Sequence, residues 1–307
     1  MNRRRRVLLA LIGLGIAFSL ILTGLHARFP SVPGWDELFV AAGLREGAQQ
    51  AGYTPGFLFV DVGQGDCTLA LGYDSAVLID AGPGDALHRV KEALNTHGVE
   101  RVDAMILTHP HEDHIGGAAG VMEDFPVGAV YLPEGDPVEE ADANSLNALL
   151  QIALEQSVDV VRLTQSAELA FGDLTLSIYL SPVSSSDENE NGLVVRAALP
   201  ALSALITGDA GTDTEFALME RGDRLDSDIL KVGHHGSKTS TSPAFLRRVA
   251  PKAAVISVGI NSYGHPSETV TSRLTAAEIP YYRTDVSGSL FFDENTLLSS
   301  AAFSSAA

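Results

Sequence analysis

Short apolar runs, separated by turn-forming residues, dominate the chain from Phe57 onward. Runs of about four to eight apolar and β-branched residues, bounded by Gly, Pro, Asn or Asp, are typical of buried strands. The pattern predicts strands over 57–62, 66–71, 76–80, 103–108, 128–132, 158–163, 174–180, 193–199, 203–207, 253–258, 280–284 and 289–292.

Helical spacing of apolar residues occurs between several of these runs. Apolar residues that recur three and four positions apart place one stripe along a helix. This spacing predicts helices over 85–97, 115–123, 144–156, 212–221, 242–249 and 267–277. The early strands follow one another closely, whereas the later strands alternate with helices. We therefore expect an α/β (α+β) domain in which helices flank sheets, although the pattern leaves the strand order open.

The N-terminus carries the longest apolar stretch. Four arginines at 3–6 precede the uncharged residues 7–25, which are about enough to cross a hydrocarbon core of about 30 Å as a helix. The arginines should stay cytoplasmic, so the rest of the chain is expected outside the membrane. We favour a signal anchor over a cleaved signal peptide, because Leu25-His26-Ala27 matches a cleavage site poorly. A buried core helix is a third alternative, which the arginine flank disfavours.

These patterns divide the chain into four parts. They are a signal anchor or signal peptide at 1–28, a connector at 29–55, an α/β domain at 56–295 and a Ser/Ala-rich tail at 296–307. An anchored chain would be extracytoplasmic and held to the cytoplasmic membrane by its N-terminal helix. Cleavage of that helix would make it secreted.

Composition limits the partners. The chain has 307 residues and a formal net charge of −19, although four of its positive charges stand together at 3–6. The rest of the chain is therefore strongly acidic, and it has no general electrostatic attraction for nucleic acid or anionic lipid. Any polyanionic substrate therefore needs a local positive site. The single cysteine, Cys67, excludes a disulfide framework. Its apolar neighbours predict a buried side chain rather than a reactive thiol.

One polar cluster carries the candidate chemistry. Residues His109–His114, which read HPHEDH, follow the apolar strand at 103–108 and precede a helix-like stretch. Three imidazoles this close together would repel one another if they were protonated. If the imidazoles are neutral, they offer converging lone pairs that a divalent metal ion can bind. The cluster therefore predicts a metal site on a strand-to-helix loop.

Five further motifs accompany this cluster in order. They are Asp61–Asp66 (DVGQGD), Val77–Gly82 (VLIDAG), Leu205–Asp209 (LITGD), Leu230–Ser237 (LKVGHHGS) and Tyr263–Pro266 (YGHP). The set resembles the metallo-β-lactamase superfamily. Within that superfamily it looks like the hydrolase domain of the competence protein ComEC and its stand-alone relatives, over about residues 56–295.

The resemblance implies a metallo-β-lactamase αββα four-layer sandwich, here preceded by one N-terminal hydrophobic helix. It also implies two divalent metal ions between the sheets, zinc in the first place, with manganese as the alternative. His109 and His111 would bind the first ion, and Asp113 and His114 the second. Asp209 would bridge both ions.

The resemblance assigns further roles around the ions. One histidine of the His234–His235 pair would complete the second site, and we favour His235 because the ligand in related members precedes a Gly. Asp80 would hold the ligand loop by hydrogen bonds. His265 would contact substrate or donate a proton, so that Asp113 and His265 are the expected catalytic residues.

Several positions also have plain structural explanations. Asp209 follows a predicted strand, so it could simply be a turn residue. His265 could likewise be a turn residue that precedes a proline. Asp61 and Asp66 either stabilise the Gly-rich turn between the first strands or lie near the site. Lys231 is expected to be solvated, with phosphate binding as the alternative.

One departure from the lactamases matters. Lactamases place another metal-binding histidine between the first cluster and the bridging aspartate, but this chain has no histidine between His114 and Asp209. The chain reads NENGLVV there, and we expect Asn191 to support the site from the second layer. The ComEC-like group typically shows Asn and Ser in this segment, but Gly192 stands where Ser is usual. An amide oxygen binds metal more weakly than imidazole and prefers a harder ion such as Mn²⁺.

The chemistry implied is metal-assisted hydrolysis, in which bound metal activates a water as hydroxide near neutral pH. The first hypothesis is a phosphodiesterase or nuclease, with a phosphodiester substrate that includes DNA. The alternatives are an extracellular esterase that acts on cell-wall phosphodiesters, similar to a phosphorylcholine esterase, and a metal-stabilised binding module without catalysis. The expected partners are this substrate and the membrane, and no protein partner can be identified.

Overall fold

The computed structural model describes residues 52–185 and 187–296. The expected N-terminal helix, most of the expected connector and nearly all of the expected tail lie outside these residues. Among the described helices, none combines the length and the apolar character that crossing a bilayer requires.

Seven described strands form the first sheet. In spatial order they are β14 (Leu290–Phe292), β1 (Gly56–Phe59), β2 (Thr68–Leu71), β3 (Ala76–Ile79), β4 (Ala104–Ile106), β5 (Ala129–Pro133) and β6 (Asp159–Leu163). Neighbouring strands run antiparallel from β14 to β3 and parallel from β3 to β6. The C-terminal ends of β3 to β6 therefore lie at one edge of the sheet.

The second sheet repeats this plan, also with seven described strands. In spatial order they are β13 (Tyr281–Arg283), β12 (Ala253–Ile256), β11 (Ile229–Lys231), β10 (Ser203–Ile206), β9 (Leu193–Ala198), β8 (Leu174–Leu180) and β7 (Ala167–Phe171). Strands β13 to β10 run parallel, and β10 to β7 run antiparallel. The parallel half of this sheet is the half whose loops enter the site.

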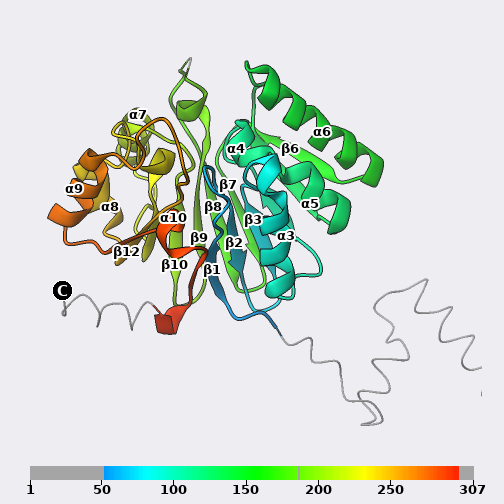
Figure 1. The fold of residues 1–307 in the computed structure, drawn as a ribbon, viewed down its shortest axis with the longest axis horizontal. Coiled ribbons are helices and arrows are strands. Elements are labelled where there is room, and N and C mark those ends of the chain that lie inside the picture. Colours follow the sequence, from blue (N-terminus) through cyan, green and yellow to red (C-terminus); the bar gives the residue numbers. More distant parts are fainter. Residues whose placement is uncertain (1–51, 186, 297–307) are drawn as a thin grey trace, which may run out of the picture. The chain divides into compact units, whose positions relative to one another are not determined.

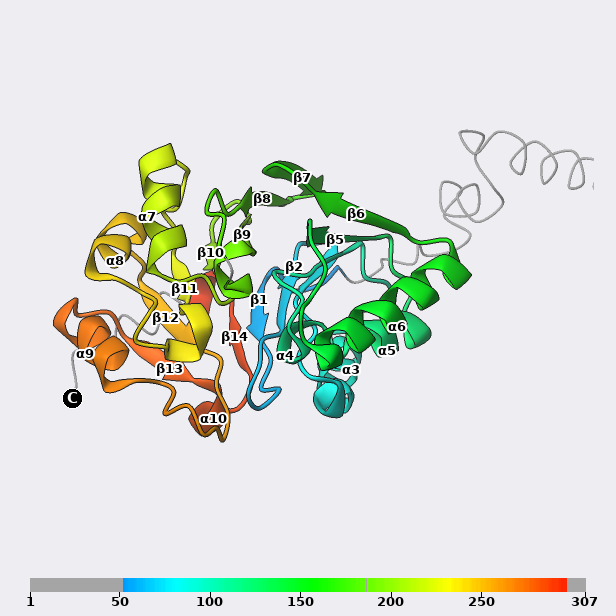
Figure 2. The ribbon, with the colours of Figure 1, turned by 90° about the horizontal axis from the view of Figure 1, so that it is seen from above.

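Helices cover the outer face of each sheet (Figures 1 and 2). The first sheet carries α3 (Leu87–Thr96), α4 (Glu112–Ile115), α5 (Ala118–Asp124) and α6 (Glu140–Gln156). The second carries α7 (Thr212–Arg221), α8 (Pro243–Val249) and α9 (Glu268–Ala276), and α10 (Thr284–Ser287) precedes β14. Three 3-10 turns, η1 (Gly84–Ala86), η2 (Glu188–Asn191) and η3 (Gly233–Gly236), interrupt the described loops. This arrangement confirms the expected αββα sandwich.

Alternation along the strands builds three apolar layers. Successive side chains of a strand point to opposite faces. In β1, Phe57 and Phe59 enter the core between the sheets, whereas Leu58 enters the core under the helices of the first sheet. In β10, Ile206 faces the same central core and Leu205 packs toward α7, α8 and α9. Both faces of each sheet are thus buried, which explains why most strands read as continuous apolar runs.

Most predicted elements occur within two to four residues of their predicted bounds, and the predicted burial of Cys67 is confirmed. Two strands were not predicted. β7 alternates half-buried and exposed residues, so it lacks an apolar run, and β11 is three residues long and contains Lys231. The cluster is also more helical than the predicted loop, because α4 begins at Glu112 and includes Asp113 and His114.

Candidate metal centre

The site forms where strands from both sheets end. Asp80 follows β3, His109 follows β4, Asp209 follows β10, and the His234–His235 pair follows β11. β3 and β4 are parallel neighbours, as are β10 and β11, so the four loops leave their sheets at shared edges. Residues that are far apart in the chain therefore meet between the sheets.

His109 and His111 face each other. The Nε2 atom of His109 lies 3.1 Å from the Nδ1 atom of His111. His109 is buried, and His111 lies partly open to solvent at the start of α4. Two imidazole nitrogens at this distance share either a proton or a cation, and neutral imidazole is a common metal ligand.

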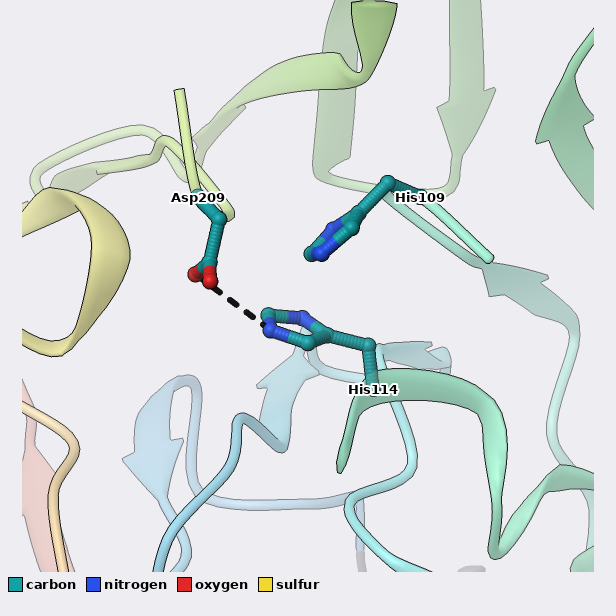
Figure 3. Close-up of side chains that lie close together, drawn as sticks. All are labelled: His109, His114 and Asp209. Carbon is teal, nitrogen blue, oxygen red and sulfur yellow. Dashed lines mark ion pairs between the residues drawn. The ribbon is translucent and has the colours of Figure 1, made fainter. Parts of the chain in front are cut away.

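Asp209 faces two further histidines of the cluster. Its Oδ1 atom lies 3.3 Å from Nε2 of His114, and Figure 3 shows His109 and Asp209 converging from two loops and His114 from α4. Its Oδ2 atom lies 3.5 Å from Nε2 of His235. That same nitrogen lies 3.2 Å from Oδ2 of Asp113. The two carboxylate oxygens of Asp209 therefore face two different groups of ligand atoms.

The donor set fits divalent metal ions. Ligand atoms of His109, His114 and Asp209 lie within 4.8 Å of one another, as do those of Asp113, His114 and His235. Nε2 of His114 and Oδ1 of Asp209 are both buried and face each other as an ion pair at 3.3 Å, but neither has a partner in hydrogen-bond geometry among the described residues. Buried polar atoms without partners are costly, and a cation between them would satisfy both. The structure thus brings together the residues that the sequence assigned to metal binding.

A second layer of oxygens orients the histidines. The Nδ1 atom of His114 lies 2.8 Å from Oδ2 of Asp80, and Nδ1 of His235 lies 2.9 Å from the Ser257 carbonyl oxygen. Asp80 also accepts hydrogen bonds from the amide and hydroxyl of Thr108, at 2.7 and 2.8 Å. These contacts turn the Nε2 atoms toward the cluster. Asp80 thus occupies the supporting position expected from the sequence.

The His234–His235 pair divides into an inner and an outer residue. His235 is buried, whereas His234 is half-buried and its Nε2 atom lies 3.6 Å from Oδ2 of Asp209. Both residues have left-handed backbone angles, with φ near +50°, which turn the chain sharply after β11. The ring of His234 stands 5.5 Å from that of His265, centroid to centroid. His235 is therefore better placed as an inner ligand, and His234 faces the open side.

Electrostatics separates the roles of the histidines. Burial and the neighbouring His114 hold the pKa of His109 well below its ordinary value, so its ring is neutral and can bind a cation. Burial lowers the pKa of His114 as well, but the carboxylates led by Asp209 and Asp80 outweigh burial and hold it well above its ordinary value. Without metal, His114 therefore carries a proton that a bound cation would displace.

Lys231 is a correction to the sequence analysis. The expectation of a solvated lysine is wrong, because Lys231 is fully buried on β11. Its Nζ atom forms an ion pair with Asp66 and donates a hydrogen bond of 2.9 Å to the Gly208 carbonyl oxygen. Asp66 is buried beside the site, with its Oδ1 atom 3.7 Å from Nδ1 of His235. The pair supports the Asp209 and His235 loops from behind.

The segment before β9 places Asn191 behind the ligands. Its amide accepts a hydrogen bond from the N–H of Ser185 at 2.9 Å and donates one to the Ser185 carbonyl at 2.7 Å, and the residue lines a cavity beside His109. Two neighbours on η2 lie closer to the ligands. The Glu188 carboxylate lies 3.5 Å from Nε2 of His111, and Asn189 lines the cavity. No metal-ligand spacing in the sequence marked these residues.

Two neighbouring cavities open at the cluster. The first, about 210 Å³, is lined by Gln64, His111, Asp113, Asn189, Asp209, His234, His235, Tyr263 and His265. The second, about 340 Å³, begins at His109 and has an apolar floor that includes Leu107 and Leu132. None of the described residues that line either cavity is Lys or Arg. The structure thus places His265 in the metal cavity, as expected.

Comparisons with known proteins agree with this geometry. Residues 60–260 match the family described as the metallo-beta-lactamase superfamily. The chain is 34% identical to ComE operon protein 3 of Bacillus subtilis over 64% of its length. It is also 34% identical to competence protein ComA of Neisseria gonorrhoeae over 76% of its length. It spans only 25% and 31% of those proteins.

A solved structure shares the fold. The metallo-beta-lactamase fold protein YhfI from Bacillus subtilis superposes with a TM-score of 0.52 at 13% identity, covering 78% of this chain and 100% of that protein. At this identity the likeness concerns the fold alone. Together with the family match and the cluster geometry, it leads to one conclusion: the chain belongs to the metallo-β-lactamase superfamily and is a ComEC-like member of it.

Proposed function

We propose that the protein is a metal-dependent phosphodiesterase that binds two divalent ions, zinc or manganese. The observation that carries the proposal is the convergence of buried imidazole nitrogens and carboxylate oxygens whose facing atoms have no hydrogen-bond partner among the described residues. His109, His111 and Asp209 would hold one ion. Asp113, His114, His235 and Asp209 would hold the other.

Divalent ions bound there would lower the pKa of a water molecule to about 7 and neutralise charge that develops on phosphoryl oxygens. The chain's own residues position these groups. Asp80 and the Ser257 carbonyl fix two of the ligand rings. Asp113, which is partly exposed and faces the cavity, is the ligand nearest to incoming substrate.

His265 would contact the substrate rather than protonate it. Burial and the neighbouring His234 hold the pKa of His265 below its ordinary value, so its ring is neutral near pH 7. A neutral imidazole still donates one hydrogen bond. Its Nδ1 atom is buried and lacks a partner among the described residues. We therefore expect His265 to orient a phosphoryl or ester oxygen.

DNA is the first candidate substrate, because the relatives named above are competence proteins. One observation favours a second candidate. The net charge is −19, and no described Lys or Arg lines either cavity, so little beyond the metal would attract a polyanion. A small phosphodiester, such as one of the cell wall, would need no such attraction. We further propose that the chain acts outside the cytoplasm and is anchored by residues 7–25.

Turnover of a defined set of substrates tests the proposal. The purified protein, loaded with Zn²⁺ or Mn²⁺, is assayed with bis-p-nitrophenyl phosphate, single- and double-stranded DNA and a chromogenic cephalosporin. We expect hydrolysis of the diester, at least a hundredfold loss with His111→Ala, and no turnover of the cephalosporin. Cleavage of DNA would select the nuclease over the small-diester enzyme.

Other outcomes contradict the proposal in different ways. Cephalosporin turnover would identify a lactamase. A protein that binds metal but turns over none of these substrates would be a metal-stabilised binding module.

A further inference from the structure

Asn189 lines the metal cavity and has an amide oxygen that no described residue satisfies. It lies on η2 and lines the same cavity as His111 and Asp209. Its Oδ1 atom is buried and has no hydrogen-bond partner among the described residues. Leaving a buried acceptor unsatisfied is energetically costly. The position therefore calls for a ligand from the cavity side.

The orientation of this amide is determined by its neighbour. The Nδ2 atom of Asn189 donates a hydrogen bond of 2.9 Å to Oδ1 of Asp187, and the backbone N–H donates to the same oxygen at 3.1 Å. An ionised carboxylate only accepts hydrogen bonds. The amide nitrogen must therefore face Asp187, which leaves the oxygen as the atom available to the cavity.

The segment that carries Asn189 is fastened to the His109 loop. The N–H of Leu193 donates a hydrogen bond of 2.7 Å to the carbonyl oxygen of Thr108. A β-carbon added at Gly192 would stand 2.9 Å from that oxygen and 3.4 Å from Cβ of His109. Gly192 thus permits the close approach that a larger residue would prevent. η2 is held beside the half of the site that contains His109 and His111.

That half of the site has the fewest protein ligands. Among the described residues its proposed ligands are His109, His111 and the shared Asp209, with the Glu188 carboxylate 3.5 Å from His111. No histidine occurs in the chain between His114 and Asp209. We propose that Oδ1 of Asn189 is a direct ligand of the first metal ion. Amide oxygen suits harder ions such as Mn²⁺, whereas imidazole suits Zn²⁺. The inference rests on the proposed metal centre. With Asn189 as a ligand, we expect the first site to prefer a hard ion.

Metal affinity measured without any substrate tests this inference. Mn²⁺ and Zn²⁺ are titrated into the metal-free protein by calorimetry, with chelator competition for tight binding, and the Mn²⁺ paramagnetic resonance signal counts the occupied sites. With Asn189→Ala we expect at least a tenfold loss of Mn²⁺ affinity at one of two sites. With Asn189→His the ratio of Zn²⁺ to Mn²⁺ affinity at that site should rise at least tenfold.

Asn191→Ala is the matched control, because it removes two hydrogen bonds of the same turn but no group that lines the metal cavity. We expect its metal affinities to stay within twofold of the unsubstituted protein. Circular dichroism of each metal-free variant checks folding. If Asn189→Ala does not fold, Asn189→Asp and Asn189→His carry the test, because both keep a ligand atom.

The possible failures are distinguishable. If Asn189→Ala binds both ions as tightly as the unsubstituted protein, the inference is wrong and water satisfies the amide oxygen. If Asn191→Ala loses as much affinity as Asn189→Ala, the shape of the turn matters and the ligand role is wrong. If the unsubstituted protein itself binds no Mn²⁺ or Zn²⁺, the proposed metal centre fails with it.

Discussion

Each imidazole of the inner cluster has an oxygen behind its second ring nitrogen. Asp80 stands behind His114, the Ser257 carbonyl behind His235, and the Thr108 hydroxyl 3.1 Å from Nδ1 of His109. Such partners fix which nitrogen faces the metal and raise its basicity. The rings are thus held in place before any ion binds, which reduces the entropy cost of binding.

Asp80 gives the first prediction at this scale. Asp80→Ala removes the acceptor of His114 and of two Thr108 groups. We expect metal affinity to fall about 10- to 100-fold, the range found for lost supporting partners. Chelator competition measures it. Asp85→Asn, a change at an exposed carboxylate on η1, is the control and should alter nothing. Equal affinities for Asp80→Ala and the control would contradict the supporting role.

Lys231 gives a prediction about stability. Lys231→Met leaves the Asp66 carboxylate buried without its ion-pair partner. Breaking a buried pair costs about 3–5 kcal/mol, so the free energy of unfolding in urea, measured on metal-free protein, should fall by that amount. The double variant Lys231→Met, Asp66→Asn should recover part of it.

A surface pair supplies the control for this measurement. Lys252 lies 2.8 Å from Asp228 with its side chain mostly exposed. Lys252→Met should therefore cost less than about 1 kcal/mol. If the two lysine substitutions destabilise equally, the buried pair has no special role.

At the scale of elements, the helices hold the loops that carry the ligands. Glu215 on α7 is buried and accepts backbone hydrogen bonds from Thr241 and from Ser242, the latter at 2.9 Å. These residues end the loop that begins with the His234–His235 turn. The loop therefore depends on a carboxylate in a helix that contributes no proposed ligand.

Glu215 makes stability depend on pH. Burial raises the pKa of Glu215 from 4.5 to about 7, despite the N–H groups of Ser242 and Thr241. Because its pKa is raised in the folded state, the protonated Glu215 carboxyl favours folding. Its contribution to the free energy of unfolding is complete below the unfolded pKa and is lost as pH rises through the folded pKa. From pH 4.5 to 7 we expect Glu215 to remove up to about 3 kcal/mol from the free energy of unfolding.

The difference between two titrations isolates this effect. Urea unfolding of the metal-free protein from pH 4.5 to 8 is compared with that of Glu215→Gln, which cannot ionise. The stability gap should shift in favour of the variant as pH rises. Parallel curves would show that Glu215 has the same pKa in the folded and unfolded states.

The sequence predicted those features that a local pattern determines. Buried runs marked twelve of the described strands, and His109–His114 marked one half of the site because its ligands are adjacent in the chain. Asp209 and His235 required a resemblance, since nothing local links them to that run. β11 escaped prediction because Lys231 looks polar until Asp66 is known to face it.

Asn189 shows a second reason why part of the site could not be predicted from the sequence. Asn189 and Asn191 stand in the same polar stretch, and only the hydrogen bonds with Asp187 and Ser185 decide which of them turns toward the cavity. The two residues are two positions apart on η2, about two thirds of a 3-10 turn. No periodicity in so short a segment predicts which of the two faces the cavity.

On the scale of the whole molecule, the proposed metal centre draws its ligands from the loops and helix that follow strands of both sheets. His109 and His114 come from the first sheet, whereas Asp209 and His235 come from the second. An ion bound between them links the two layers across the central core. Metal should therefore stabilise the entire domain rather than one loop.

Metal removal tests this link. When the concentration of free metal is a hundred times the dissociation constant, binding should add about 2.7 kcal/mol per site to the free energy of unfolding. We expect chelation to lower the Tm, and added Zn²⁺ or Mn²⁺ to restore it in a concentration-dependent way. His111→Ala should show a smaller rise, because one site is weakened. A Tm that changes neither with chelator nor with added metal would contradict the proposal that metal connects the two sheets.

The pairing of β14 with β1 has a consequence for how the chain is made. Phe57 stands opposite Phe292, so the strand that begins the described domain is completed by the strand that ends it. During synthesis, the edge of β1 that pairs with β14 stays unpaired until β14 is made. Phe59 then also lacks its contact with Phe292, whose ring centroid is 6.0 Å away in the folded domain. An open apolar edge invites pairing with other chains. The nascent protein is therefore expected to be prone to aggregation until β14, the last of the described strands, emerges and pairs with β1.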